Sequence, residues 1–218
     1  MNTPMGVGMS EWMKQFRLIA LLAVFVGVTG CGPARSFNEE VIDVKGQYPD
    51  LANRSVAIVV SMSDFAEFNH PRAKQAITEE MSRRIQANVP GVTLTSPGEI
   101  LKWQKENAYW ATRPPSMLIK QLKVDRLVLV EIGEYRTHEP GDKHILRGVI
   151  SASINIVEAE ASDPDNFGAS FTKNTMYPEP GESKVGRVGD SEALIEARTQ
   201  IRFCESAAGI FYDHQIIR

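Results

Sequence analysis

The chain lacks the sequence signatures of the common catalytic and metal-binding sites. Its 218 residues contain no G-x-S-x-G motif, no P-loop and no Rossmann glycine pattern. The four histidines do not have the spacing of a metal motif such as H-E-x-x-H. His138 and His144 flank a predicted turn and could hold a metal together, but we favour a solvated turn. We therefore predict no catalytic residue, no metal and no cofactor.

The chain also lacks an excess of positive charge. It has 24 Lys and Arg against 27 Asp and Glu, which gives a formal net charge of −3. A nucleic-acid-binding domain is typically basic, with Lys and Arg gathered on one face. The composition therefore predicts no nucleic-acid partner.

No apolar run in the chain is long enough to span a bilayer. The longest, residues 18–28, has eleven residues that are all apolar or Gly, whereas a spanning helix needs about 20. The apolar core of a signal peptide needs only about 7–15 residues and a basic segment before it. Lys14 and Arg17 supply that charge, so the sequence predicts a signal peptide.

The apolar run ends at Val28-Thr29-Gly30-Cys31, which resembles the lipobox of bacterial lipoproteins. The resemblance implies that residues 1–30 are a signal peptide and that Cys31 is the lipid-attachment residue and the mature amino terminus. Acylation of Cys31, palmitate included, would then anchor the protein to the membrane. Gly32 rather than Asp follows the cysteine, which implies the outer membrane, on its periplasmic side. An ordinary secretory signal is the alternative, and translation could start at Met1, Met9 or Met13.

Cysteine is scarce, with only Cys31 and Cys204 in the chain. If Cys31 is lipidated, Cys204 has no partner for an intrachain disulfide. Cys204 falls on an apolar stripe, so we expect it to be a small buried hydrophobic residue rather than a nucleophile.

The first half of the mature chain reads as a tether followed by strands and helices. Residues 31–54 have two Pro, two Gly and scattered charge, which predicts a tether. Residues 55–62 predict a buried strand, with Asp64 in the loop after it. Residues 69–89 predict a helix with Pro71 in its first turn. Its predicted buried stripe is Ala73, Ile77, Met81, Ile85 and Val89.

The next segments predict a short strand and two helices. Residues 92–96 form the short strand, and "SPGE", residues 96–99, predicts a capping box that starts a helix. Pro114-Pro115 predicts the start of another helix.

The second half reads as a β-hairpin followed by a long helix. Residues 126–135 predict a strand, residues 137–143 a turn, and residues 145–161 an alternating strand with one polar face. Residues 168–177 predict a further strand and residues 178–190 an exposed linker. The last predicted helix, residues 192–214, carries an apolar stripe of Leu194, Ala197, Ile201, Cys204, Ala208 and Phe211. The predicted class is α/β, a single mixed sheet of about four to five strands packed with helices, plus the C-terminal helix.

One cluster of aromatic residues is a candidate partner surface. Trp103, Tyr109 and Trp110 lie near Arg113 and two prolines, and aromatic residues with Arg are enriched where proteins bind one another. Packing against one end of the core is the alternative for these rings.

The predicted hairpin offers two further candidates for function. Its polar face, Ser151, Ser153 and Asn155, could meet a partner, and an exposed sheet edge could accept a strand from another chain. Glu131 and Glu134 follow a buried strand, but residues three apart on an extended chain should point to opposite faces.

The segments "SVAIVVSMSDF", "VTLTSPGEILKWQ" and "LKVDRLVLVEIGEY" resemble, over residues 54–177, the small α/β domain of periplasmic lipoproteins. Examples are the penicillin-binding-protein activator lipoprotein, the curli secretion-channel lipoprotein and the amino-terminal domain of the Tol–Pal translocation protein. The resemblance implies a binding domain without catalytic residues, and it transfers no site residue.

Three functions follow as hypotheses for residues 55–218 as a periplasmic domain. The first is a lipid-anchored cell-envelope binding module without catalytic activity, whose protein partner belongs to peptidoglycan synthesis or export. The second is a subunit of an oligomeric outer-membrane export assembly, which would make the chain a homo-oligomer. The third is an envelope hydrolase that combines Glu131 or Glu134 with His138 or His144.

Overall fold

The computed structural model describes residues 41–179 and 191–217. The elements in these residues are, in chain order, β1 (Val41–Val44), β2 (Ser55–Met62), α2 (Asp64–Asn69), α3 (Ala73–Asn88), β3 (Thr93–Leu94), α4 (Pro97–Glu106), the 3-10 helix η1 (Trp110–Thr112), α5 (Pro115–Leu122), β4 (Arg126–Glu139), β5 (Asp142–Glu158), β6 (Ala169–Tyr177), α6 (Glu192–Ala208) and β7 (His214–Ile217). Cys31, the predicted signal peptide and most of the predicted linker lie outside the described residues. Among the helices described, none combines the length and the apolar character that crossing a bilayer requires.

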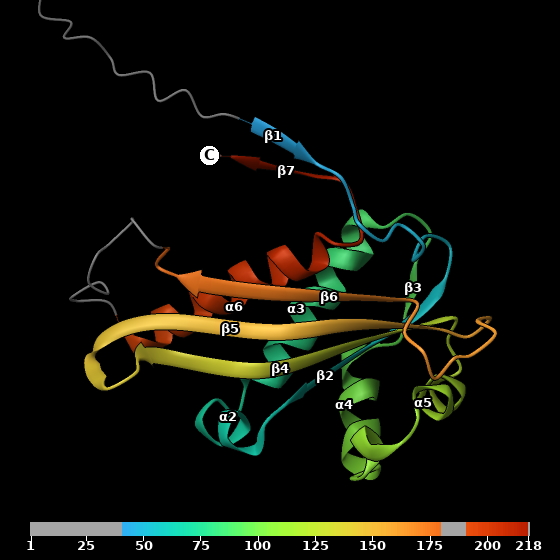
Figure 1. Ribbon diagram of the computed structural model, residues 1–218, viewed down its shortest axis with the longest axis horizontal. Coiled ribbons are helices and arrows are strands. Elements are labelled where there is room, and N and C mark those ends of the chain that lie inside the picture. Colours follow the sequence, from blue (N-terminus) through green and yellow to red (C-terminus); the bar gives the residue numbers. More distant parts are fainter. Residues whose placement is uncertain (1–40, 180–190, 218) are drawn as a thin grey trace, which may run out of the picture. The chain divides into compact units, whose positions relative to one another are not determined.

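A five-stranded mixed sheet lies at the centre of the fold, in the order β3-β2-β4-β5-β6 (Figure 1). Strand β2 pairs in parallel with β3 and β4, whereas β4, β5 and β6 pair antiparallel. The β-branched run of β2 is buried on both faces, as expected for a strand in a parallel pair. The predicted α/β class with a mixed sheet and a C-terminal helix is confirmed.

Helices α3 and α6 cover one face of the sheet, which we call the first face. The predicted stripe of α3 is confirmed, since Ala73, Ile77, Met81, Ile85 and Val89 are all buried in the main core. The helix begins at Ala73, so Pro71 lies in the turn before it rather than in its first turn.

Asp64 was predicted in a loop, and that prediction is wrong. The side chain of Ser63 accepts a hydrogen bond from the backbone N–H of Ala66 and so caps a short helix, α2, that begins at Asp64. Asp64 itself lies in the first turn, where an acidic side chain is favoured by the helix dipole.

Helices α4 and α5 cover part of the opposite face, the second face, over a smaller apolar cluster. The predicted capping box is confirmed at the start of α4. Ser96 Oγ accepts from the backbone N–H of Glu99, and the Glu99 carboxylate accepts from the backbone N–H of Ser96.

The β4–β5 hairpin is longer than the sequence predicts. Strand β4 runs to Glu139 and β5 starts at Asp142, so only Pro140 and Gly141 remain as the turn. Gly141 has φ +85°, a conformation that side chains disfavour.

The predicted stripe of the C-terminal helix is confirmed in its second half, where Cys204, Ala208 and Phe211 are buried, and is wrong in its first half. Leu194 and Ile201 are 39% and 48% exposed, and Ala197 is exposed as well. The buried residues of α6 are Ile195, Thr199, Phe203, Cys204, Ala207 and Ala208.

Helix α6 lies close to β5 because the strand has Gly148 at the point of contact. A Cβ at that glycine would overlap the Thr199 side chain. Helix α6 ends at Ala208 rather than near residue 214, and residues 214–217 form β7, which pairs with β1 in a separate two-stranded sheet.

The described part of the predicted tether packs against the domain. Tyr48 and Leu51 are buried members of the main core. The backbone N–H groups of Gln47 and Tyr48 both donate to the carbonyl of Ile210. Backbone hydrogen bonds and apolar contacts therefore hold residues 45–54 against the domain, whereas a tether would be exposed to solvent.

Candidate functional site

The two tryptophans of the predicted aromatic surface pack against the smaller apolar cluster. Trp103 of α4 and Trp110 of η1 are half-buried against the apolar cluster under α4 and α5, with ring centroids 6.0 Å apart. Both rings pack against that cluster while remaining partly exposed, and partner binding by them stays a prediction.

Arg113 and Tyr109 have different environments within the same corner. Arg113 Nη1 donates to the side-chain oxygens of Asn107, at 3.3 Å, and Gln121, at 3.0 Å, and so connects the C-cap residue of α4 to α5. The Tyr109 ring is 78% exposed. Of the four predicted partner-binding residues, Tyr109 therefore offers the largest surface to a partner.

A bulge in β4 brings Glu131 and Glu134 onto the same face. Glu131 pairs with Ser153 and Glu134 pairs with Ser151, with a register shift at Gly133 between them. Residues opposite one another in a ladder point to the same side, and two residues two apart on a strand share a face. The prediction that the two glutamates point to opposite faces is wrong, because the extra residue of the bulge shifts the alternation.

These glutamates belong to a polar area of the second face that α4 and α5 leave uncovered. The register aligns Ser61, Glu131, Ser153 and Thr172 across four strands. We define the open face as Ser61, Glu131, Glu134, Ser151, Ser153, Ser170, Thr172 and Asn174, all of them exposed or half-exposed. Asn155, predicted on the same polar face, is buried.

The open face offers hydroxyl, amide and carboxylate groups on a flat surface. Ser153 Oγ donates to Glu131 at 3.2 Å, and Arg136 Nε donates to Glu134 at 2.7 Å. Each group keeps further donor or acceptor capacity for a ligand. This chemistry suits an extended polar contact with another macromolecule.

A second exposed surface, on α2, was not predicted from the sequence. Phe65 and Phe68 are 77% and 84% exposed, and residues three apart lie on one side of a helix. Ala66 is the only buried residue of α2, so the helix turns its aromatic residues outward. The signal that could have revealed the helix itself is Ser63 in "SDFAEFNH", because serine is a favoured residue at a helix start.

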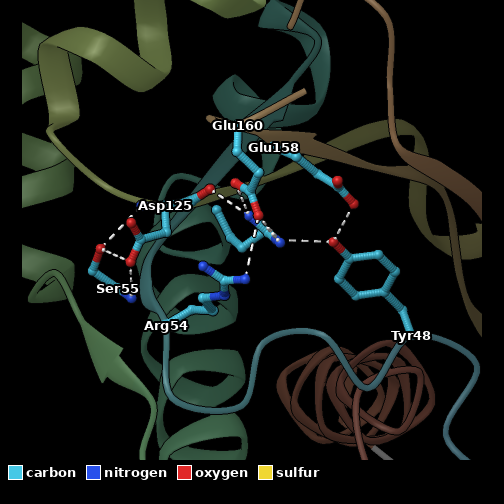
Figure 2. Close-up of polar contacts among 7 residues, drawn as sticks. Tyr48, Arg54, Ser55, Asp125, Glu158 and Glu160 are labelled. Carbon is cyan, nitrogen blue, oxygen red and sulfur yellow. Dashed lines mark hydrogen bonds and ion pairs between the residues drawn. The ribbon is translucent and has the colours of Figure 1, made fainter. Parts of the chain in front are cut away.

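A cluster of polar contacts joins the N-terminal segment to the end of the sheet (Figure 2). Arg126 makes a bidentate ion pair with Glu160, at 2.5 and 2.6 Å, and its Nε donates to the Tyr48 hydroxyl at 3.0 Å. Tyr48 in turn donates to Glu158 at 2.6 Å. The cluster fixes Tyr48, and with it residues 45–54, on the sheet.

The same cluster shifts the ionisation of its members. The hydrogen bonds from the Arg126 guanidinium lower the pKa of Glu160 to about 2. Burial and the hydrogen bond to Glu158 raise the pKa of Tyr48, and the hydrogen bonds from Ser55 lower the pKa of Asp125. Because charged partners explain the shift of Glu160, we interpret the cluster as structural.

His70 and His138 contact carboxylates of α6. The buried His70 stacks on Tyr135 and contacts Glu196 at 3.3 Å. His138 lies 3.8 Å from Glu192, and His144 is exposed. Within residues 41–179 and 191–217, no three His, Cys, Asp or Glu side chains come together as they would around a metal ion.

Cys204 is buried in the main core, as predicted. Burial raises the pKa of its thiol to about 12, so the reactive thiolate is disfavoured. The proposed lipid-attachment residue, Cys31, is outside the described residues.

No protein-family model matches the chain, and no curated protein matches it either. Among solved structures it is similar to a PelC dodecamer from Paraburkholderia phytofirmans, with a TM-score of 0.43 and 10% identity over 79% of this chain and 97% of that one. It is also similar to lipoprotein GNA1162 from Neisseria meningitidis, with a TM-score of 0.43 and 13% identity over 70% and 97% of the two chains. The hypothetical protein CT253 from Chlamydia trachomatis gives a TM-score of 0.40 and 16% identity over 72% and 97%. Likenesses of this size carry no conclusion about function.

Proposed function

We propose that this protein is a lipid-anchored binding module of the bacterial cell envelope, without catalytic activity of its own. Residues 1–30 are its signal peptide and Cys31 carries the lipid. Gly32 after the cysteine favours the outer membrane, with the domain facing the periplasm. The partner is a protein of the envelope, in peptidoglycan synthesis or export.

The open face is the observation that carries the binding part of this proposal. It is polar, spans four strands through the row Ser61, Glu131, Ser153 and Thr172, and lies beside the exposed edge of the sheet. The rims and wet parts of protein interfaces are built from such groups. The exposed rings of Phe65, Phe68 and Tyr109 provide further contact area of the kind that carries binding energy.

The anchor is tested by Cys31→Ala. We expect this variant to lose lipid labelling and to leave the membrane fraction, because one sulfur atom carries the acyl chains and several chains are needed for stable anchoring. Membrane fractionation after metabolic labelling with a fatty acid measures the effect. Cys204→Ala, which removes a buried thiol, is the matched control and should stay in the membrane. Labelling that persists in Cys31→Ala would contradict the assignment of the anchor.

The partner surface is tested by placing a photoreactive amino acid at Thr172 on the open face and, as a control, at the exposed Gln75 on α3. We expect a discrete protein adduct in whole cells from position 172 and little or none from position 75. The mass of the adduct separates a second copy of this chain from another envelope protein. Equal adducts from both positions would mean that the open face is not the binding surface.

A further inference from the structure

Strand β6 is the outermost strand of the sheet and has a free edge. It pairs with β5 along all nine of its residues, and no strand in the described part of the chain pairs with its other side (Figure 1). The outward N–H and C=O groups of such an edge are a template for another extended chain. Its second-face side chains, Ser170, Thr172 and Asn174, are part of the open face, so a bound strand would extend that surface.

Lys173, the only charged residue of β6, stands at the centre of this edge strand. It pairs with Ala152, a buried residue of the first face, so its side chain leaves the sheet on the core side. Burial lowers the pKa of Lys173. Within residues 41–179 and 191–217 the structure gives its ammonium group no hydrogen bond and no ion pair. The centre of the edge therefore holds a half-buried cation without a counter-charge.

This lysine disfavours pairing of β6 with a second copy of itself. A symmetric antiparallel pair of β6 strands, centred on the strand, places Lys173 opposite the same lysine of the other copy. Like charges directly opposite one another destabilise a strand pair, and a lysine on an edge strand is a common device against self-association. A strand with a carboxylate at the same position would be favoured instead.

We propose that the outer edge of β6 is a strand-addition site for an extended segment of another protein that places an Asp or Glu opposite Lys173. The inference rests on the proposed function, since it describes how the envelope partner is held. Backbone hydrogen bonds to the edge supply affinity. Lys173 sets the register and rejects strands with a cation at the paired position, which is selection by a repulsive element as well as an attractive one.

A charge-swap cycle tests the proposal with the full chain purified in detergent. The probes are the nine-residue peptide ASFTKNTMY, which is the β6 sequence itself, and its K173E form. We expect the unaltered chain to bind the K173E peptide about ten-fold more tightly than the other, and Lys173→Glu in the protein to invert this preference. Binding should slow amide hydrogen exchange in residues 169–177, which a contact made only by side chains would not do.

Two variants keep the test decisive. Lys102→Glu changes the net charge equally on α4, which packs on β2 rather than β6, and should leave the preference unchanged. The Lys173→Thr variant should bind both peptides with similar affinity, and threonine is favoured in strands. This variant provides the test if Lys173→Glu does not fold. Absence of exchange protection with either peptide, or a preference that Lys173→Glu does not invert, would overturn the proposal. Such a failure would leave membrane anchoring by Cys31 and crosslinking at Thr172 untouched, so it is distinguishable from failure of the proposed function.

Discussion

Phe203→Ala is expected to lower the free energy of unfolding by about 3–5 kcal/mol, since truncating a buried aromatic residue removes its apolar contacts and leaves a cavity. Phe203 is fully buried in the main core, where α6 meets α3 and the first face of the sheet. Denaturant unfolding followed by circular dichroism measures the loss. Phe203→Leu retains much of the apolar volume, should lose less, and gives a reading if Phe203→Ala does not fold.

Ile201→Ala is the matched control on the same helix. Ile201 is 48% exposed, so its truncation should change the free energy of unfolding by about 0.5 kcal/mol or less. The sequence stripe of α6 predicts the opposite order, with Ile201 as the core residue. A larger loss for Ile201→Ala than for Phe203→Ala would mean that the helix is rotated relative to the structure described above.

The buried face of α6 was not predictable in its first half because two different sets of residues there have the spacing of a buried helix face. Leu194, Ala197 and Ile201 have the apolar spacing of a buried face, whereas the true face includes Thr199, which looks polar. Thr199 Oγ1 donates to the carbonyl of Ile195 at 2.6 Å and so satisfies its own hydroxyl inside the core. Its position over Gly148 depends on a strand that is distant in sequence.

The elements with strong local signals were predicted well. The β-branched run of β2, the four-residue spacing on α3 and the capping box at Ser96 each depend on neighbours within a few residues. Local patterns of this kind determine the type of an element with little help from tertiary contacts. The order of these elements was enough to predict the α/β class.

The surface features depend on geometry that no local pattern encodes. A single bulge at Gly133 places Glu131 and Glu134 on one face, against the period-two rule. Tyr48 and Leu51 lie in a segment whose sequence looks polar. They are buried because they pack against core residues that are distant in the sequence. The open face and the free edge of β6 exist because of strand order, which arises from long-range pairing.

Glu160→Gln is expected to lower the free energy of unfolding at pH 7 by about 2–3 kcal/mol, because it removes the counter-charge of a buried arginine. The Arg126 side chain is 4% exposed, and its partner Glu160 is 50% exposed. Water can therefore reach the site, which places the loss below that of a fully buried pair. Arg126 keeps its contacts to Tyr48 and to the backbone carbonyl of Asp125.

Glu205→Gln is the control for Glu160→Gln. Glu205 lies 3.6 Å from Arg84, which keeps its contact with Glu80 when Glu205 is changed. The loss should be about 0.5 kcal/mol or less. Equal losses of unfolding free energy in the two variants would show that burial of Arg126 does not make its ion pair more stabilising than an exposed one.

The pH dependence of the Glu160→Gln effect separates the ion pair from simple loss of packing. The pKa of Glu160 is lowered from 4.5 to about 2 in the folded protein by the hydrogen bonds from Arg126. A carboxylate whose folded pKa is depressed stabilises the protein above its unfolded pKa, and this stability is lost as pH falls through the interval down to the folded pKa. The difference between the unaltered chain and Glu160→Gln should be constant from pH 7 to about 5 and should shrink as pH falls toward 2. A difference that stays constant over the whole range would mean that Glu160 stabilises the fold through contacts that do not depend on its charge.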